Sequence, residues 1–169
     1  MRRSKIINLF GCSFTNWYRS GTWGDIVRKK YGSNFLVNNY GRPGSSNDEQ
    51  FKRVLKSIEE IDSQKKYMYI IQLTGLERVA VNNKNSPSLR NLCEDLKFNW
   101  LSPYANASEG FKIDNFWKEY FKKEWTPEKH LNRLFSNILK IQNTLDTFQN
   151  VEYVFFLGWD IFCARSGSV

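Results

Sequence analysis

Histidine and cysteine, the side chains that bind most structural metal ions, are scarce in this chain. It has a single histidine and three cysteines, Cys12, Cys93 and Cys163, which lie far apart in the sequence. No two of them have the spacing of a zinc ligand set, so a structural zinc site is not expected. We expect no metal or other cofactor, and free thiols of the kind that a reducing cytosol maintains.

Long apolar runs are also missing. No stretch approaches the roughly 20 apolar residues that a membrane-spanning helix needs. The apolar run that follows Met1–Lys5 is too short for a signal peptide and has no small-residue cleavage site. The sequence therefore predicts a cytoplasmic protein with no membrane partner.

Concentrated positive charge is missing too, although the total is high. Lys and Arg number 25 against 17 Asp and Glu, a formal net charge of +8. This excess favours encounter with anionic partners. However, the short clusters Arg28–Lys30 and Lys65–Lys66 stand at or just past expected helix ends, where cations complement the helix dipole. Proteins that bind nucleic acid usually concentrate basic residues on one face, so nucleic acid is a less favoured partner than a small molecule.

What the chain does have is an alternation of strand-like and helix-like segments. Its 169 residues, 41% of them hydrophobic, suffice for one globular domain over 1–169. The expected strands are 5–10, 35–39, 67–73 and 151–157, and the expected helices are about 23–32, 47–61, 113–123 and 127–148. Residues of about 82–110 are expected to form an irregular insertion. The alternation predicts a three-layer α/β sandwich with a parallel sheet, its first strand between the second and the third, and the fourth beyond the third.

Two glycine-containing loops carry the strongest functional signal. Gly11-Cys12-Ser13 follows the first expected strand, and Asn39-Tyr40-Gly41-Arg42-Pro43-Gly44 follows the second. Parallel strands place such loops together at the carboxyl edge of the sheet, where open α/β sheets bind ligands. The two loops therefore predict a site for an anion or an oxyanion.

These loops resemble the first two sequence blocks of the SGNH (GDSL-type) hydrolases, with Cys12 in place of the Asp of the Gly-Asp-Ser signature. The segment Thr74-Gly75-Leu76-Glu77-Arg78, after the third strand, adds a similarity to a phage-type branch of that family. The resemblance covers roughly the first 80 residues and beyond them rests on strand–helix order alone. It implies a flavodoxin-like, SGNH-like fold and a serine esterase mechanism.

The resemblance also implies roles for individual residues. Ser13 would be the nucleophile, and the backbone N–H groups of Ser13 and Gly44 would point at the developing oxyanion. The family's third oxyanion donor is an Asn after the third strand; here Thr74 offers a hydroxyl at that place. Apart from the resemblance, Arg42 and Arg78 stand in or just after the site loops, where they either bind an anionic group of the ligand or are solvated surface residues. Asn47 is expected as a further ligand-binding residue.

The general base is missing from this pattern. The family carries an Asp-x-x-His block near its C-terminus, whereas the one histidine here, His130, precedes the fourth strand. A serine without a base is a poor nucleophile at neutral pH. Two interpretations stay open, as does the oligomeric state. One is an SGNH-like domain that hydrolyses acyl or acetyl esters, such as those on carbohydrates, and is truncated, without the last strand–helix unit, or inactive. The other is a non-catalytic phage or virion protein, in the host cytoplasm or the virion, that binds a small anionic ligand, nucleotide or carbohydrate in the same pocket.

Overall fold

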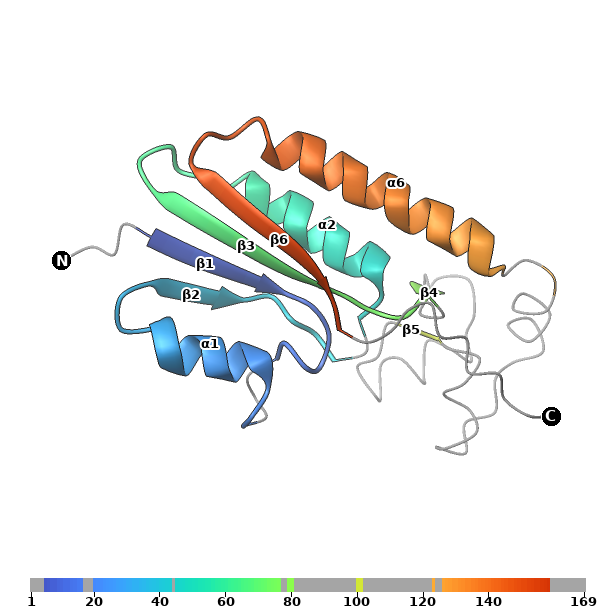
Figure 1. Ribbon diagram of the computed structural model, residues 1–169, viewed down its shortest axis with the longest axis horizontal. Helices are drawn as coiled ribbons and strands as arrows, with labels where there is room; N and C mark the ends of the chain where they lie inside the picture. Colours follow the sequence, from blue (N-terminus) through green and yellow to red (C-terminus); the bar gives the residue numbers. More distant parts are fainter. Residues whose placement is uncertain are drawn as a thin grey trace, which may run out of the picture.

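A four-stranded parallel sheet forms the centre of the molecule. The computed structural model describes residues 5–16, 20–43, 45–76, 79–80, 100–101, 123 and 126–158. In the sheet the neighbours are, in order, β2 (Leu36–Asn39), β1 (Lys5–Phe10), β3 (Lys66–Leu73) and β6 (Val151–Leu157). Helix α1 (Trp23–Tyr31) covers one face, and α2 (Asn47–Ile58) and α6 (Pro127–Leu145) cover the other (Figure 1). The predicted three-layer α/β sandwich and its strand order are confirmed.

The main hydrophobic core lies between the sheet and the layer of α2 and α6. Alternate residues of a strand face the same side, so every second residue of β3 contributes to this core. Its fully and largely buried members on β3 and the two helices are Tyr67, Tyr69, Ile71, Leu73, Phe51, Val54, Ile58, Leu134, Ile141 and Leu145. Burial of each large apolar side chain contributes about 1.5–3 kcal/mol. This packing fixes the strand ends from which the site loops leave.

Two helices end earlier than their apolar periodicity predicts. Helix α2 ends at Ile58 rather than near residue 61, and α6 at Leu145 rather than near residue 148. The N–H of Ile61 donates to the carbonyl of Ile58 (3.2 Å), and that of Phe148 to the carbonyl of Leu145 (3.0 Å). These i→i+3 bonds belong to a tightened last turn. Ile61 and Phe148 still pack against the core, so the apolar pattern continues past the helical hydrogen bonding.

The predicted irregular insertion at 82–110 and the predicted helix at 113–123 lie mostly outside the described residues. The described part of the insertion, β5 (Trp100–Leu101), pairs antiparallel with β4 (Val79–Ala80). Two residues of the predicted irregular segment therefore form a strand, and their partner β4 precedes that segment. Strands of two residues are too short to show a periodicity that a sequence can reveal.

Candidate functional site

The loop after β1 carries Ser13 and folds as a tight turn. The N–H groups of Thr15 and Asn16 both donate to the carbonyl of Cys12, over 3.1 and 3.2 Å. Cys12 is fully buried, whereas Ser13 beside it is half-buried. The turn leaves Ser13 partly exposed at the carboxyl end of β1, the position at which the family resemblance predicts a nucleophile.

A buried glutamine on β3 anchors this loop. Gln72 Oε1 accepts hydrogen bonds from Thr15 Oγ1 (2.8 Å) and from Trp23 Nε1 (3.1 Å). The Cys12 thiol donates to the same oxygen over 3.7 Å. Gln72 is 2% exposed and Thr15 is 0% exposed, so these bonds form away from competing water. One side chain thus joins the Ser13 loop, α1 and the centre of the sheet.

Two glycines make room for the side chain of Gln72. A Cβ at Gly11 would lie 1.8 Å from Thr15 Oγ1 and 2.8 Å from Gln72 Oε1. A Cβ at Gly158, directly after β6, would lie 2.2 Å from Gln72 Nε2. The glycine of the Gly-Cys-Ser segment is therefore explained by close packing behind the serine.

The loop after β2 is hydrogen-bonded to the serine loop. Asn39 Nδ2 donates to the carbonyl of Thr15 (2.6 Å), and Asn39 Oδ1 accepts from the N–H of Gly41 (2.8 Å). The N–H of Arg42 donates to the carbonyl of Gly11 (3.1 Å). The structure therefore brings the two glycine-containing loops together at the carboxyl edge of the sheet.

Thr74, which follows β3, is joined to the start of α2. The N–H of Thr74 donates to Asn47 Oδ1, and Asn47 Nδ2 donates to the carbonyl of Thr74, each over 2.8 Å. Thr74 Oγ1 donates to the carbonyl of Ser45 over 3.4 Å, and Thr74 is 0% exposed. In this arrangement Asn47 and Thr74 hold the loop before α2 against the end of β3. Direct contact of either residue with a ligand stays a prediction.

The remaining predicted site residues are placed less completely. Gly44 and Arg78 lie outside the described residues. Arg42 is exposed, and its side chain makes no hydrogen bond or ion pair with any residue that the structure describes. The Ser13 hydroxyl likewise accepts and donates no hydrogen bond within the described ranges, so no base is in contact with it there.

His130 lies at the start of α6, on the α2–α6 side of the molecule. It is half-buried, and burial lowers the pKa of its imidazole, with the charge of Arg133 acting in the same direction and that of Asp48 opposing them. These charged neighbours belong to the two helices and not to the Ser13 loop. The electrostatic surroundings of His130 are therefore those of the helix pair.

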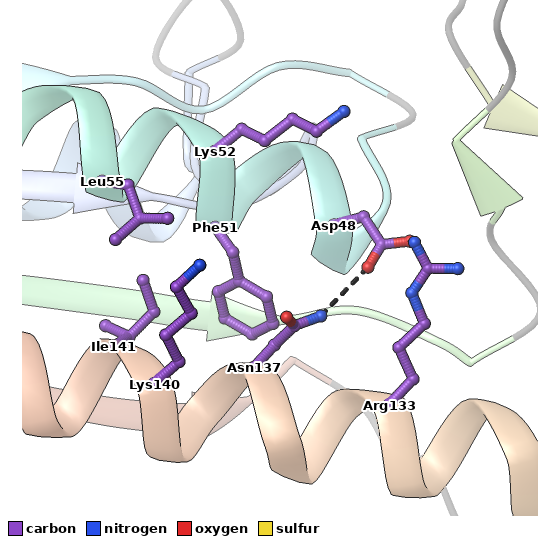
Figure 2. Close-up of a pocket in the computed structure, with 8 residues that line it drawn as sticks. All are labelled: Asp48, Phe51, Lys52, Leu55, Arg133, Asn137, Lys140 and Ile141. Carbon is purple, nitrogen blue, oxygen red and sulfur yellow. Dashed lines mark hydrogen bonds and ion pairs between the residues drawn. The ribbon is translucent and has the colours of Figure 1, made fainter.

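A cavity of about 210 Å³ lies between α2 and α6 (Figure 2). It is lined by Asp48, Phe51, Lys52, Leu55, Arg133, Asn137, Lys140 and Ile141. The carboxylate of Asp48 is bound by Arg133 and by Asn137 Nδ2, each over 3.1 Å. All the lining residues come from the two helices, so this cavity is separate from the loops that carry Ser13 and Thr74.

Neither a membrane span nor a metal cluster is found in the described part of the chain. None of the described helices is at once long and apolar enough to cross a bilayer. Among the same residues, no three His, Cys, Asp or Glu side chains gather as ligands of one ion would.

Comparisons with known proteins add little to this geometry. Neither family models nor curated proteins gave a match. Among solved structures, a chain from Streptococcus pneumonia, provisionally described as a platelet activating factor, is similar over 89% of this chain, with 14% identity and a TM-score of 0.29. This chain spans 64% of the length of that one. A likeness at this TM-score says nothing about function, so the candidate site is defined only by the contacts within this chain.

The sequence predicts the positions of the loops but not the side chains that hold them. Gln72, Thr15 and Trp23 were not expected at the site. One signal was available, because Gln72 interrupts an otherwise apolar and aromatic strand. A polar side chain in a buried strand needs hydrogen-bond partners, which points to a polar cluster at that strand's end.

Proposed function

We propose that this chain is an SGNH-like esterase-type domain in which Ser13 attacks the acyl carbon of an acyl or acetyl ester. The observation that supports the proposal is that polar side chains of the loops are engaged in hydrogen bonds, whereas the Ser13 hydroxyl does not take part in these bonds. Thr15, Asn39 and Gln72 use their polar groups to hold the loops together. The Ser13 hydroxyl is half-exposed and engages none of the described residues. A hydroxyl held on a fixed turn in this way is positioned to react.

The chemistry follows the course of acyl transfer to a serine. Attack by Ser13 Oγ gives a tetrahedral intermediate, whose oxyanion is stabilised by N–H donors, here those of Ser13 and Gly44 according to the family resemblance. Collapse of the intermediate breaks the ester C–O bond, releases the alcohol and leaves an acylated Ser13, which water then hydrolyses. A proton must leave Ser13 Oγ in the first step. Since no described residue accepts it, we expect simple esters to react slowly.

The lack of a base in contact with Ser13 among the described residues also favours a second function. In this alternative the same loops bind a small anionic ligand, a nucleotide or a carbohydrate without turnover, as in a non-catalytic phage or virion protein. The loops and their hydrogen bonds would then serve recognition alone.

Hydrolysis of para-nitrophenyl acetate distinguishes the two functions. We expect slow turnover by the wild-type chain, roughly 10⁴–10⁶ below that of an enzyme with a complete triad. The Ser13→Ala variant is expected to lose this turnover. The matched control Ser33→Ala, at an exposed serine after α1, is expected to retain it. Equal rates for the wild type and Ser13→Ala would contradict the esterase and leave the binding function.

A further inference from the structure

A second arginine reaches the same loops from within α2. Arg53 donates a hydrogen bond from its guanidinium to Ser45 Oγ. Its Nε is buried and has no hydrogen-bond partner among the residues that the structure describes. Arg53 forms no ion pair with a residue in the described part of the chain. A guanidinium has five N–H donors, and one that is largely out of water with a single hydrogen bond is incompletely satisfied.

The loop before α2 connects Arg53 to the serine loop. Ser45, which receives the hydrogen bond from Arg53, donates its N–H to the carbonyl of Arg42 (3.1 Å). The N–H of Arg42 in turn donates to the carbonyl of Gly11 (3.1 Å), two residues before Ser13. Arg42 therefore begins a short turn whose main chain is bonded to Gly11, and Arg53 binds Ser45 at the other end of that turn.

The charges around this turn leave an excess of positive charge. Burial lowers the pKa of Arg53 to about 10, the charge of Glu49 opposes this shift, and the charge of Arg42 adds to it, so the two arginines are electrostatically coupled. Glu49 supplies one negative charge, and its Oε2 accepts a hydrogen bond from Ser45 Oγ over 3.4 Å. Asp48, the other carboxylate in the first turn of α2, is already bound by α6, as Figure 2 shows. Among the described residues, the charges of Arg42 and Arg53 are thus balanced here by the one carboxylate of Glu49.

We propose that Arg42 and Arg53 together bind an anionic group of the ligand, a carboxylate or a phosphate, beside Ser13. A guanidinium presents paired N–H donors that match the oxygens of either group, and its affinity is greatest where water is excluded. The inference rests on the proposed function for the identity of the site. If the proposed esterase function holds, the substrates are esters that also carry a carboxylate or a phosphate, which the two arginines bind.

Anion binding is measured without relying on catalysis. For the wild type and for each variant, the melting temperature in sodium phosphate is compared with that of the same protein in sodium chloride of equal ionic strength. We expect phosphate to stabilise the wild type in a concentration-dependent manner, as a ligand of the folded state does. Arg53→Gln and Arg42→Gln are expected to weaken the apparent phosphate affinity about tenfold or more, since each removes hydrogen bonds between charged groups.

Lys52→Gln is the matched control, because it removes the same charge from an exposed neighbouring position of α2. It is expected to leave the phosphate response unchanged. If Arg53→Gln does not fold, the exposed Arg42→Gln variant and the charge-retaining Arg53→Lys carry the test. The proposal is overturned if phosphate stabilises the wild type no more than chloride, or if Arg42→Gln and the folded Arg53 variant respond like the wild type.

A second measurement separates this proposal from the esterase itself. The half-ester para-nitrophenyl succinate, which is charged, is compared with neutral para-nitrophenyl acetate. We expect the wild type to prefer the charged ester and the two arginine variants to lose about tenfold of that preference. A phosphate response that depends on both arginines, with no hydrolysis of either ester, supports the anion site and refutes the esterase. Hydrolysis without a preference for the charged ester, together with no phosphate response, overturns the anion site and leaves the esterase standing.

Discussion

Replacing Gln72 with leucine tests whether this one side chain holds the serine loop in place. The change keeps a side chain of similar size but removes the acceptor of Thr15 Oγ1 and of Trp23 Nε1. A buried donor left without a partner costs about 1–3 kcal/mol. Thr15 is 0% exposed, so water does not replace its lost acceptor. For the two bonds together we expect the free energy of unfolding to fall by about 2–4 kcal/mol.

Chemical denaturation of a double-mutant cycle measures this effect. Thr15→Val removes one donor, so its cost in the Gln72→Leu background should be smaller than in the wild type. We expect a coupling energy of about 1 kcal/mol or more between the two positions. Gln64→Leu, at an exposed position in the turn before β3, is the control and should change stability little. Additive effects of Gln72→Leu and Thr15→Val would show that the hydrogen bond between these two side chains does not stabilise the folded protein.

Three further substitutions test other contacts of the site and its supporting helices. Asn47→Ala removes both 2.8 Å hydrogen bonds to the main chain of Thr74 and should lower the free energy of unfolding in urea by about 2–4 kcal/mol; a loss below about 1 kcal/mol would speak against this link. Gly24→Ala places a Cβ 1.9 Å from a main-chain oxygen of the serine loop, so it should lower the melting temperature even though alanine is favoured over glycine in a helix by about 1 kcal/mol; a raised melting temperature would contradict the close approach. The ion pair with Lys29 is the main cause that lowers the pKa of Asp25 from its ordinary value of 3.8 to about 2. Because the folded state favours the charged carboxylate, Asp25 stabilises the folded protein above pH 3.8, and this stabilisation is lost as the pH falls through about 2. Asp25→Asn should therefore melt below the wild type at pH 6 and like it near pH 2, and a difference that does not change with pH would disprove the assignment.

The strand order was predictable because it follows from local patterns and general rules of chain connection. Apolar runs mark the strands, helical periodicity marks the helices, and right-handed crossovers leave few arrangements. The helix ends were less predictable, since Ile61 and Phe148 continue the apolar periodicity although the helical hydrogen bonding has stopped before them. The apolar pattern predicts which residues are buried, whereas hydrogen bonding defines where the helix ends. At these two helix ends the buried residues extend past the last helical hydrogen bond.

The loops of the site were predictable from their glycines and serine, but their supporting contacts were not. Gln72 bonds Thr15 across 57 positions of sequence and Trp23 across 49, and only the finished sheet brings them together. Arg53 reaches Ser45, eight positions before it, by the length of its side chain. Sequence periodicity predicts which face of an element is buried, but not which partner a long polar side chain binds.

Labelling of the folded chain with a fluorophosphonate, followed by mass-spectrometric mapping of the adduct, determines whether Ser13 is a reactive nucleophile. A fluorophosphonate phosphonylates a nucleophilic serine and needs no later hydrolysis of the adduct, so it reports on Ser13 even when turnover is slow. We expect one adduct, on the peptide that contains Ser13, which forms slowly and is absent from Ser13→Ala. An unlabelled wild-type chain, or an adduct on another serine with Ser13 unmodified, would contradict this expectation.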